Sequence, residues 1–163
     1  MLRRADTALL RALRTRGHAP AVERAVRLFS TLGEHGALWY ALSLAGALLD
    51  EGRRPLYVRA ARTVLVAFVA NQAIKLVVRR RRPELPGLPP LAGTMSQRSY
   101  PSAHAATSVA GARALSRAMP TATVPLHVLA AAVAVSRPYL GVHYPSDSLA
   151  GAALGAAVEE LAP

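Results

Sequence analysis

Residues 60 to 83 read AARTVLVAFVANQAIKLVVRRRRP, an apolar segment that ends in four arginines and a proline. Residues 64–70 within it are apolar on every face, whereas a helix on the surface of a soluble domain carries a polar stripe. Pro83 stops the helix because proline lacks the amide hydrogen that a helix interior requires. We therefore predict that residues 60–78 form a helix that spans a membrane and ends at a basic membrane surface.

The composition extends this prediction to the whole chain. The 163 residues fit one domain, and 52% of them are hydrophobic although the formal net charge is +11. Abundant alanine and few aromatic residues suit helices that pack closely in lipid. With no cysteine, disulfides, thiolate nucleophiles and cysteine-ligated metal sites are excluded. The expected fold class is all-α, a compact polytopic membrane bundle forming a single domain over residues 1–163.

About five spanning helices are predicted, at residues 31–49, 60–78, 102–118, 121–135 and 146–161. A bilayer span takes about 20 residues, so several of these segments are short. Either neighbouring helices and the N-terminal region shelter them, or the chain is a soluble helical bundle with an unusually apolar interior. The apolar surface of residues 64–70 favours the membrane interpretation.

The N-terminal region, residues 1–30, is predicted to be amphipathic. Between residues 5 and 15 the apolar side chains recur at helical spacing, while Arg4, Arg11 and Arg14 lie elsewhere on the helix. This pattern is typical of a basic helix lying on an anionic membrane surface. The alternative is an amphipathic helix that packs on its own domain. The region has no uninterrupted apolar core, so it lacks the form of a secretory signal.

Lys75 is the only lysine in a chain with nineteen arginines. It precedes Arg82 by seven positions, close to two helical turns, so the two cations are expected on one face. A basic flank at the membrane surface explains residues 79–82. It does not explain Lys75, which lies inside the apolar segment, where a cation usually marks a functional site. This face is a candidate site for a phosphate.

Pro101, Ser102, Ala103 and His104 have the pattern of a helix entry. Ser102 is the expected N-cap, which leaves the amides of Ala103 and His104 free to bind an oxyanion at the helix N-terminus. His104 in the first turn is placed to protonate a leaving oxygen. The alternative is an ordinary helix cap with an exposed histidine.

His143 and Asp147 form a second candidate pair. If Pro145 takes the first helical position, Asp147 is the third, and its carboxylate can accept a hydrogen bond from one ring nitrogen of His143. This bond would fix the tautomer and leave the other nitrogen as a nucleophile. The alternative is a capping aspartate beside a passive histidine.

Arg137 ends the fourth predicted helix and supplies a planar fork suited to two phosphate oxygens. Ser136 beside it is either a phosphate contact or a packing residue. Short connections between antiparallel helices bring all these residues to one side of the bundle.

These residues resemble the three motifs of the type 2 phosphatidic acid phosphatase (PAP2) family, which shares its core with vanadium haloperoxidases. The likeness covers residues 75–147, with the motifs in the family's order. Ala103 stands where the family usually has glycine, and it adds a methyl group where the backbone approaches phosphate.

The resemblance implies that His143 attacks phosphorus to give a phosphohistidine, with Asp147 orienting the ring. His104 then protonates the departing alcohol, and water releases phosphate. The residues implied in holding the phosphate oxygens are Lys75, Arg82, Ser102, Ala103, Ser136 and Arg137. No metal or other cofactor is expected, since the sequence lacks the carboxylate cluster of a magnesium site.

The implied substrate is a lipid phosphate, with membrane lipids as surroundings and no nucleic-acid partner. The short, alanine- and arginine-rich chain resembles compact actinobacterial members. A polyprenyl-phosphate sugar phosphate such as decaprenyl-phosphoryl phosphoribose is therefore favoured. The alternatives are undecaprenyl diphosphate, phosphatidate and phosphatidylglycerol phosphate. A vanadate-dependent peroxidase and a non-catalytic lipid-binding membrane protein are the alternatives of other classes.

The arginines indicate which side of the plasma membrane carries the site. With Lys75, Arg82 and Arg137 set aside, the predicted topology puts eleven arginines on the side of the N-terminus and the site, and six on the other. The positive-inside rule then places the site toward the cytoplasm and the C-terminus outside. A phosphatase that recycles polyprenyl diphosphates is expected to face outward instead.

Overall fold

The computed structural model describes residues 2–162, which are 76% helical and contain no strand. Its seven α-helices are α1 (Leu2–Thr15), α2 (Pro20–Thr31), α3 (Ala37–Leu49), α4 (Arg54–Val78), α5 (Ala103–Ala118), α6 (Thr123–Tyr139) and α7 (Pro145–Leu161). Three short 3-10 turns are η1 (Glu34–Gly36), η2 (Glu51–Arg53) and η3 (Pro120–Ala122). The prediction of an all-α fold is confirmed.

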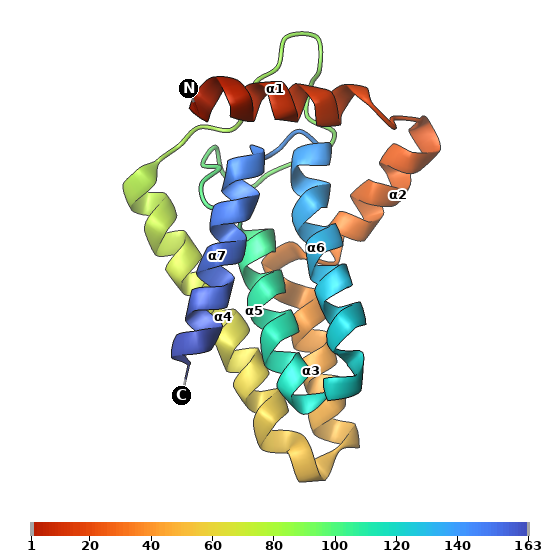
Figure 1. The fold of residues 1–163 in the computed structure, drawn as a ribbon, viewed down its shortest axis with the longest axis vertical. Helices are drawn as coiled ribbons and strands as arrows, with labels where there is room; N and C mark the ends of the chain where they lie inside the picture. The colour runs from red at the N-terminus through yellow and green to blue at the C-terminus, as the bar shows by residue number, and fades with distance from the viewer. Residues whose placement is uncertain (1, 163) are drawn as a thin grey trace.

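Helices α3 to α7 run up and down along the long axis, and α1 lies crosswise over one end of them (Figure 1). Helix α5 is central and packs against α4, α6 and α7. Its contact with α7 is close because Gly151 and Gly155 carry no side chain there. A Cβ at either position would overlap the backbone carbonyl of Ser102 or Ala106. The small residues thus bring the two backbones together, as alanine-rich packing predicts.

The apolar core fills the half of the bundle farther from α1. Trp39 of α3 is fully buried against Gly111 of α5, and its indole nitrogen donates to Ser108 Oγ at 3.0 Å. Beyond this core, the buried Glu159 carboxylate pairs with three arginines, one from α4 and two from α5: Arg59, Arg113 and Arg117. These ion pairs hold the C-terminal end of α7 to its neighbours.

The first predicted span requires a correction. The sequence predicted one helix over residues 31–49, but α2 ends at Thr31 and α3 begins only at Ala37. Between them His35 and Gly36 have left-handed backbones, with φ of 54° and 80°. Two such residues in succession cannot continue a right-handed helix. The second helix is longer than predicted, because Pro55 lies in the first turn of α4 and extends it toward η2.

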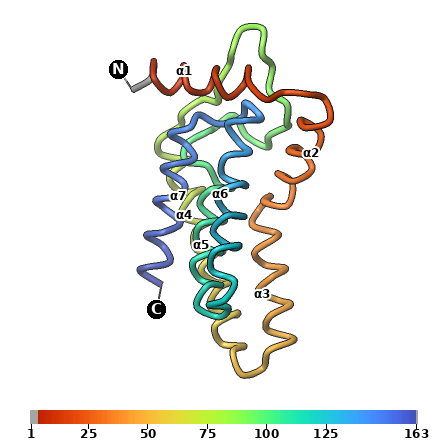
Figure 2. Tube along the Cα trace, turned by 45° about the vertical axis from the view of Figure 1, so that its right-hand side comes forward, coloured from red at the N-terminus to blue at the C-terminus, as the bar shows by residue number. Residues whose placement is uncertain are grey.

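Helix α1 lies across one end of the bundle (Figures 1 and 2), and side-chain hydrogen bonds near both of its ends join it to the rest of the chain. Near its C-terminus the buried Arg14 donates to the carbonyl of Pro89 at 2.8 Å, in the long connection between α4 and α5. Near its N-terminus Asp6 accepts from Arg80 and Ser146. Leu10 between them is fully buried. The helical prediction for residues 5–15 therefore agrees with the structure, and one face of α1 covers the protein itself.

Candidate active site

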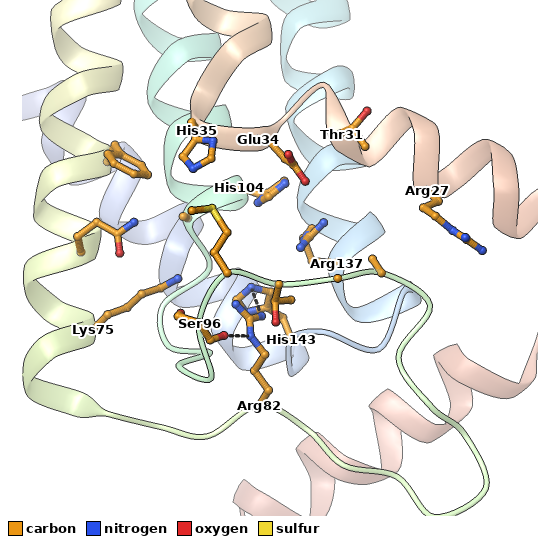
Figure 3. A pocket seen from close by; sticks show the side chains of 17 residues that line it. Arg27, Thr31, Glu34, His35, Lys75, Arg82, Ser96, His104, Arg137 and His143 are labelled. Carbon is orange, nitrogen blue, oxygen red and sulfur yellow. Dashed lines mark hydrogen bonds between the residues drawn. The ribbon is translucent and has the colours of Figure 1, made fainter.

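A cavity of about 670 Å³ opens near the end of the bundle that α1 crosses. It brings together residues from every predicted motif: Lys75, Arg82, Ala103, His104, Arg137 and His143. Figure 3 labels all of them except Ala103, and shows the labelled side chains converging from α4, α5, α6 and two connecting segments. The antiparallel arrangement of the helices accounts for this convergence.

His143 lies in the turn between α6 and α7 and is 2% exposed. Its Nε2 atom is 3.1 Å from Nη1 of Arg82. An arginine only donates hydrogen bonds, so Nε2 must be the acceptor and the ring proton must be on Nδ1. Nδ1 faces Oδ2 of Asp147 at 3.5 Å, a long separation that often shortens when a ligand fills such a site. The nitrogen with the lone pair therefore faces Arg82, and both residues line the cavity.

The surroundings keep the His143 ring neutral. Burial is the main cause that lowers its pKa to about 4, and the positive charges of Arg82 and Arg137 act in the same direction. The carboxylate of Asp147 opposes them and raises the pKa. At neutral pH the ring is thus unprotonated on one nitrogen, as a nucleophile must be.

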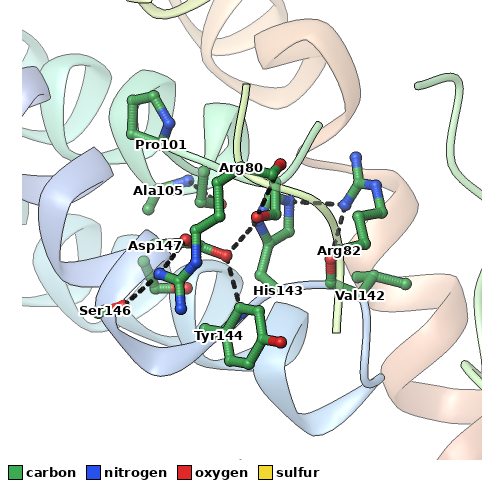
Figure 4. Close-up of polar contacts among 12 residues, drawn as sticks. Arg80, Arg82, Pro101, Ala105, Val142, His143, Tyr144, Ser146 and Asp147 are labelled. Carbon is green, nitrogen blue, oxygen red and sulfur yellow. Dashed lines mark hydrogen bonds and ion pairs between the residues drawn. The ribbon is translucent and has the colours of Figure 1, made fainter. Parts of the chain in front are cut away.

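Both backbone and side-chain contacts hold Asp147 in place, and Figure 4 shows those with Arg80 and Tyr144. Pro145 is the first residue of α7, so Asp147 is the third, as predicted. Its Oδ2 accepts from the amide of Tyr144 at 2.8 Å, and its Oδ1 accepts from Arg80 at 2.9 Å. Its own carbonyl accepts from the amide of Ser102 at 2.9 Å. The starts of α5 and α7 are therefore bonded to each other.

Three cations border the cavity. Lys75 and Arg137 are only 7% and 5% exposed. Arg137 donates to Ser30 Oγ at 2.7 Å, and Arg82 donates to the carbonyls of Ser96 and Val142 at 2.7 and 2.6 Å. Within residues 2–162, Nε of Arg137 is buried without a hydrogen-bond partner. Buried donors of this kind require an acceptor, and an anion in the cavity would supply one.

The first turn of α5 forms another wall. Ala103 and His104 both line the cavity. His104 donates one hydrogen bond to the carbonyl of Ser30. Its Nε2 atom is buried and has no partner in the part of the chain that the structure describes. Once the ring is protonated, Nε2 can donate a hydrogen bond to a phosphate ester oxygen in the cavity.

The structure places the two predicted serines outside the cavity lining. Ser102 is the N-cap of α5, and its fully buried hydroxyl accepts from the amide of Ala105 at 3.4 Å. Ser136 is buried in α6 and donates to Ser30 Oγ at 3.1 Å. Neither Ala105 nor Ser30 lines the cavity, but Ser30 in turn accepts a hydrogen bond from Arg137, which does.

Other lining residues were not singled out from the sequence. Four of them follow one another from α2 into η1: Arg27, Thr31, Glu34 and His35. Glu34 and His35 interrupt an otherwise apolar segment, a signal that the sequence does contain. Among residues 2–162, no group of three or more histidine, aspartate or glutamate side chains is arranged to hold a metal ion.

Residues 56–162 match the family model for the PAP2 superfamily. The chain belongs to this superfamily. The predicted resemblance is thus confirmed, and with it the assignment to PAP2-type phosphatases at the level of the family.

Two curated relatives are both 41% identical to the chain and carry the same name, decaprenylphosphoryl-5-phosphoribose phosphatase. The relative from Mycolicibacterium smegmatis aligns over 81% of this chain and 72% of its own length. The relative from Mycobacterium tuberculosis aligns over 85% of this chain and 77% of its own length.

Two solved structures share the fold. The crystal structure of Aquifex aeolicus LpxE has a TM-score of 0.83 and 22% identity, and the match covers 96% of this chain and 93% of that one. A transmembrane PAP2-type phosphatidylglycerolphosphate phosphatase from Bacillus subtilis has a TM-score of 0.50 and 23% identity. This match covers 97% of this chain and 92% of the other. At these identities the likeness concerns the fold.

The environment of His143 predicts how its pKa responds to Arg82→Gln. This change removes a neighbouring positive charge, so the pKa of His143 should rise from about 4 toward its ordinary value. NMR titration of labelled histidine rings would measure it. Arg81→Gln is the matched control, because Arg81 is exposed and outside the cavity lining. A wild-type pKa near 6.5, unchanged by Arg82→Gln, would contradict the buried cationic environment described here.

Proposed function

We propose that this protein is a metal-independent membrane phosphatase that hydrolyses a lipid phosphate through a phosphohistidine at His143. The observation that carries the proposal is the buried His143 ring, which lines a cavity bordered by Lys75, Arg82 and Arg137 and whose Nε2 lone pair faces Arg82. A nucleophile surrounded by fixed cations suits a phosphate group, whose negative oxygens would otherwise repel an attacking lone pair. The 41% identity to named phosphatases supports the same reaction.

In the first step, the arriving phosphate takes over the hydrogen bond that Arg82 gives to Nε2 of His143. Nε2 of His143 forms a bond to phosphorus, and the bond from phosphorus to the ester oxygen breaks. His104 donates a proton to that oxygen through its unpartnered Nε2. The negative phosphate beside His104 supplies the charge that stabilises its protonated ring beforehand.

In the second step, water attacks the phosphohistidine from the side that the alcohol has left. His104, now neutral, takes a proton from this water. The bond between Nε2 and phosphorus breaks, and inorganic phosphate leaves. Asp147 stabilises the positive charge that the His143 ring carries while it is bonded to phosphorus.

The remaining predicted residues divide into direct and indirect contacts. Lys75, Arg82 and Arg137 bind phosphate oxygens, together with the amides of Ala103 and His104. Ser102 and Ser136 act from outside the cavity, by fixing the first turn of α5 and the position of Ser30.

The favoured substrate is a polyprenyl-phosphate sugar phosphate such as decaprenylphosphoryl-5-phosphoribose, after which both relatives are named. By its name, this molecule carries a ribose between two phosphate groups. The polar side chains of Thr31, Glu34 and His35 line the same cavity, as does Arg27, one turn before Thr31 on α2 (Figure 3). With the terminal phosphate against His143, Glu34 and Thr31 are placed to bind sugar hydroxyls and Arg27 the second phosphate.

The proposed location is the plasma membrane, with α3 to α7 as spans and the site at the cytoplasmic end. Residues 51–78 form a helix long and apolar enough to cross a bilayer, the one such helix among the described residues. Large apolar side chains are exposed on α3, α6 and α7 as well: Leu44, Leu48, Val124, Val128, Val135 and Leu149. Lipid contact would account for this exposure. Helix α1 then lies at the membrane surface, and residues 1–163 act as one domain.

Phosphate release from decaprenylphosphoryl-5-phosphoribose by the detergent-solubilised protein tests the reaction. His143→Ala should lower kcat by roughly a thousandfold or more, because the nucleophile is lost. His127→Ala is the matched control, since His127 is exposed on α6 and bonds only to the carbonyl of Thr123. The same assay should include phosphatidate, phosphatidylglycerol phosphate and undecaprenyl diphosphate. If the wild-type protein binds lipid but releases phosphate from none of the four substrates, it is a non-catalytic lipid binder.

Arg27→Gln tests the substrate class. It should raise KM for the sugar phosphate roughly tenfold, the cost of one hydrogen bond to a charged group. It should leave KM for phosphatidate unchanged, because phosphatidate has no second phosphate. Arg24→Gln, an exposed arginine one turn earlier on α2, is the control. An equal rise in KM for both substrates would assign Arg27 to general attraction of anions and contradict the proposed sugar site.

Reporter fusions after the C-terminal residue test the membrane topology. Five spans with a cytoplasmic site put that end of the chain outside, so a phosphatase reporter should be active there and a cytoplasmic reporter inactive. The opposite result would contradict either the number of spans or the side of the site.

A further inference from the structure

Arg80 lies between two carboxylates from opposite ends of the chain. Its Nη1 donates to Oδ1 of Asp147 at 2.9 Å, and its Nη2 donates to Oδ2 of Asp6 at 2.7 Å. The guanidinium also stacks over the Tyr144 ring, with 4.0 Å from its central carbon to the ring centroid. A planar fork held at both ends and on one face has little freedom to move. Arg80 therefore has one fixed position relative to Asp147.

Asp6 brings helix α1 into this arrangement. Its Oδ1 accepts from the amide of Ser146 at 3.0 Å, and its Oδ2 accepts from the Ser146 hydroxyl. Burial opposes ionisation, yet the hydrogen bonds from Ser146 and Arg80 prevail and lower the pKa of Asp6. The carboxylate is thus ionised at neutral pH and binds the first turn of α7, where helix amides favour a negative charge.

Neither Arg80 nor Asp6 lines the cavity. Their direct link to the site is Asp147, whose other oxygen, Oδ2, faces Nδ1 of His143 at 3.5 Å. Partners one shell outside the reacting groups are known to orient the groups that they hold. The four side chains form a continuous series from α1 to the nucleophile.

We propose that Arg80 and Asp6 are positioning residues, and that α1 is a part of the active site because its carboxylate holds Arg80 against Asp147. This inference rests on the proposed function of His143 and Asp147.

The signs of the four charges explain why both outer residues are present. During the reaction the His143 ring becomes positive and faces the negative Asp147. Asp147 in turn contacts the positive Arg80, and Arg80 contacts the negative Asp6. Arg80 alone would fix Asp147 but also weaken its stabilisation of the positive ring. Asp6 offsets that charge while it keeps Arg80 in place. The other titratable and charged groups that act on His143 and Asp147 are Lys75, Arg82, His104 and Arg137.

The kinetic test compares Arg80→Gln with Arg81→Gln, its exposed neighbour of equal charge. Arg80→Gln should lower kcat by about 10- to 100-fold, the usual cost of a lost outer partner, and leave KM within about twofold of the wild-type value. Arg80→Lys should restore part of the activity, since a single ammonium can still reach Asp147. Arg81→Gln should behave as wild type.

A double-mutant comparison tests whether Asp6 acts through Arg80. Asp6→Asn alone should lower kcat, but added to Arg80→Gln it should cause no further loss. If the double variant instead shows the product of the two single losses in kcat, the two residues act independently and the proposed series is overturned. The fluorescence of the buried Trp39 on heating would check that each variant is folded.

An NMR titration of His143 gives a readout that does not need activity. Arg80→Gln removes a positive charge and should raise the pKa of His143, whereas Asp6→Asn removes a negative charge and should lower it. Loosened packing alone would not shift the pKa of His143 in opposite directions in the two variants. If the wild-type protein releases phosphate but Arg80→Gln matches Arg81→Gln in kcat and pKa, this inference is wrong. If the wild-type protein releases none, the proposed function fails, and the titration still decides whether the series exists.

Discussion

Close contact between the backbones of α5 and α7 is the constraint on which the site depends. Gly151 and Gly155 place no side chain of α7 against the carbonyls of Ser102 and Ala106, and the amide of Ser102 bonds to the carbonyl of Asp147. The first turns of both helices are therefore fixed relative to each other. One turn presents His104 to the cavity, and the other holds the carboxylate behind His143. The two histidines of the proposed reaction are thereby positioned by packing before any substrate arrives.

The electrostatics of the cavity follow from burial of like charges. Lys75 and Arg137 are almost fully removed from solvent, and Arg82 lies beside the ring of His143. Such cations are costly in an apolar surrounding unless an anion joins them. Burial, together with the charges of Arg82 and Arg137, lowers the pKa of His143 and keeps the imidazole neutral. In the proposed reaction the same two cations would bind the phosphate, and the hydrogen bond from Arg82 would hold the ring in the tautomer whose Nε2 attacks phosphorus.

Local chemistry made much of this site predictable from the sequence. Pro145 and Asp147 have a spacing that defines a helix start, Ser102 is a typical cap, and Lys75 is conspicuous inside an apolar segment. The prediction missed the break at residues 33–36. Residues 31–49 are apolar on average, and this average gives no sign that His35 and Gly36 have left-handed backbones. Asp6 and Arg80 were missed for a different reason. They are 74 positions apart, and only the crosswise packing of α1 brings them together.

Direct detection of the phosphorylated histidine tests the central claim. An activated phosphate monoester has a leaving group that needs no proton, so His104→Ala should still transfer phosphate to the enzyme but hydrolyse the intermediate slowly. After a rapid alkaline quench, peptide mass spectrometry should find the phosphate on His143. No phosphorylated histidine should appear in the double variant that combines His104→Ala with His143→Ala. Phosphate on another residue, or steady phosphate release with no labelled histidine at any time, would contradict the account.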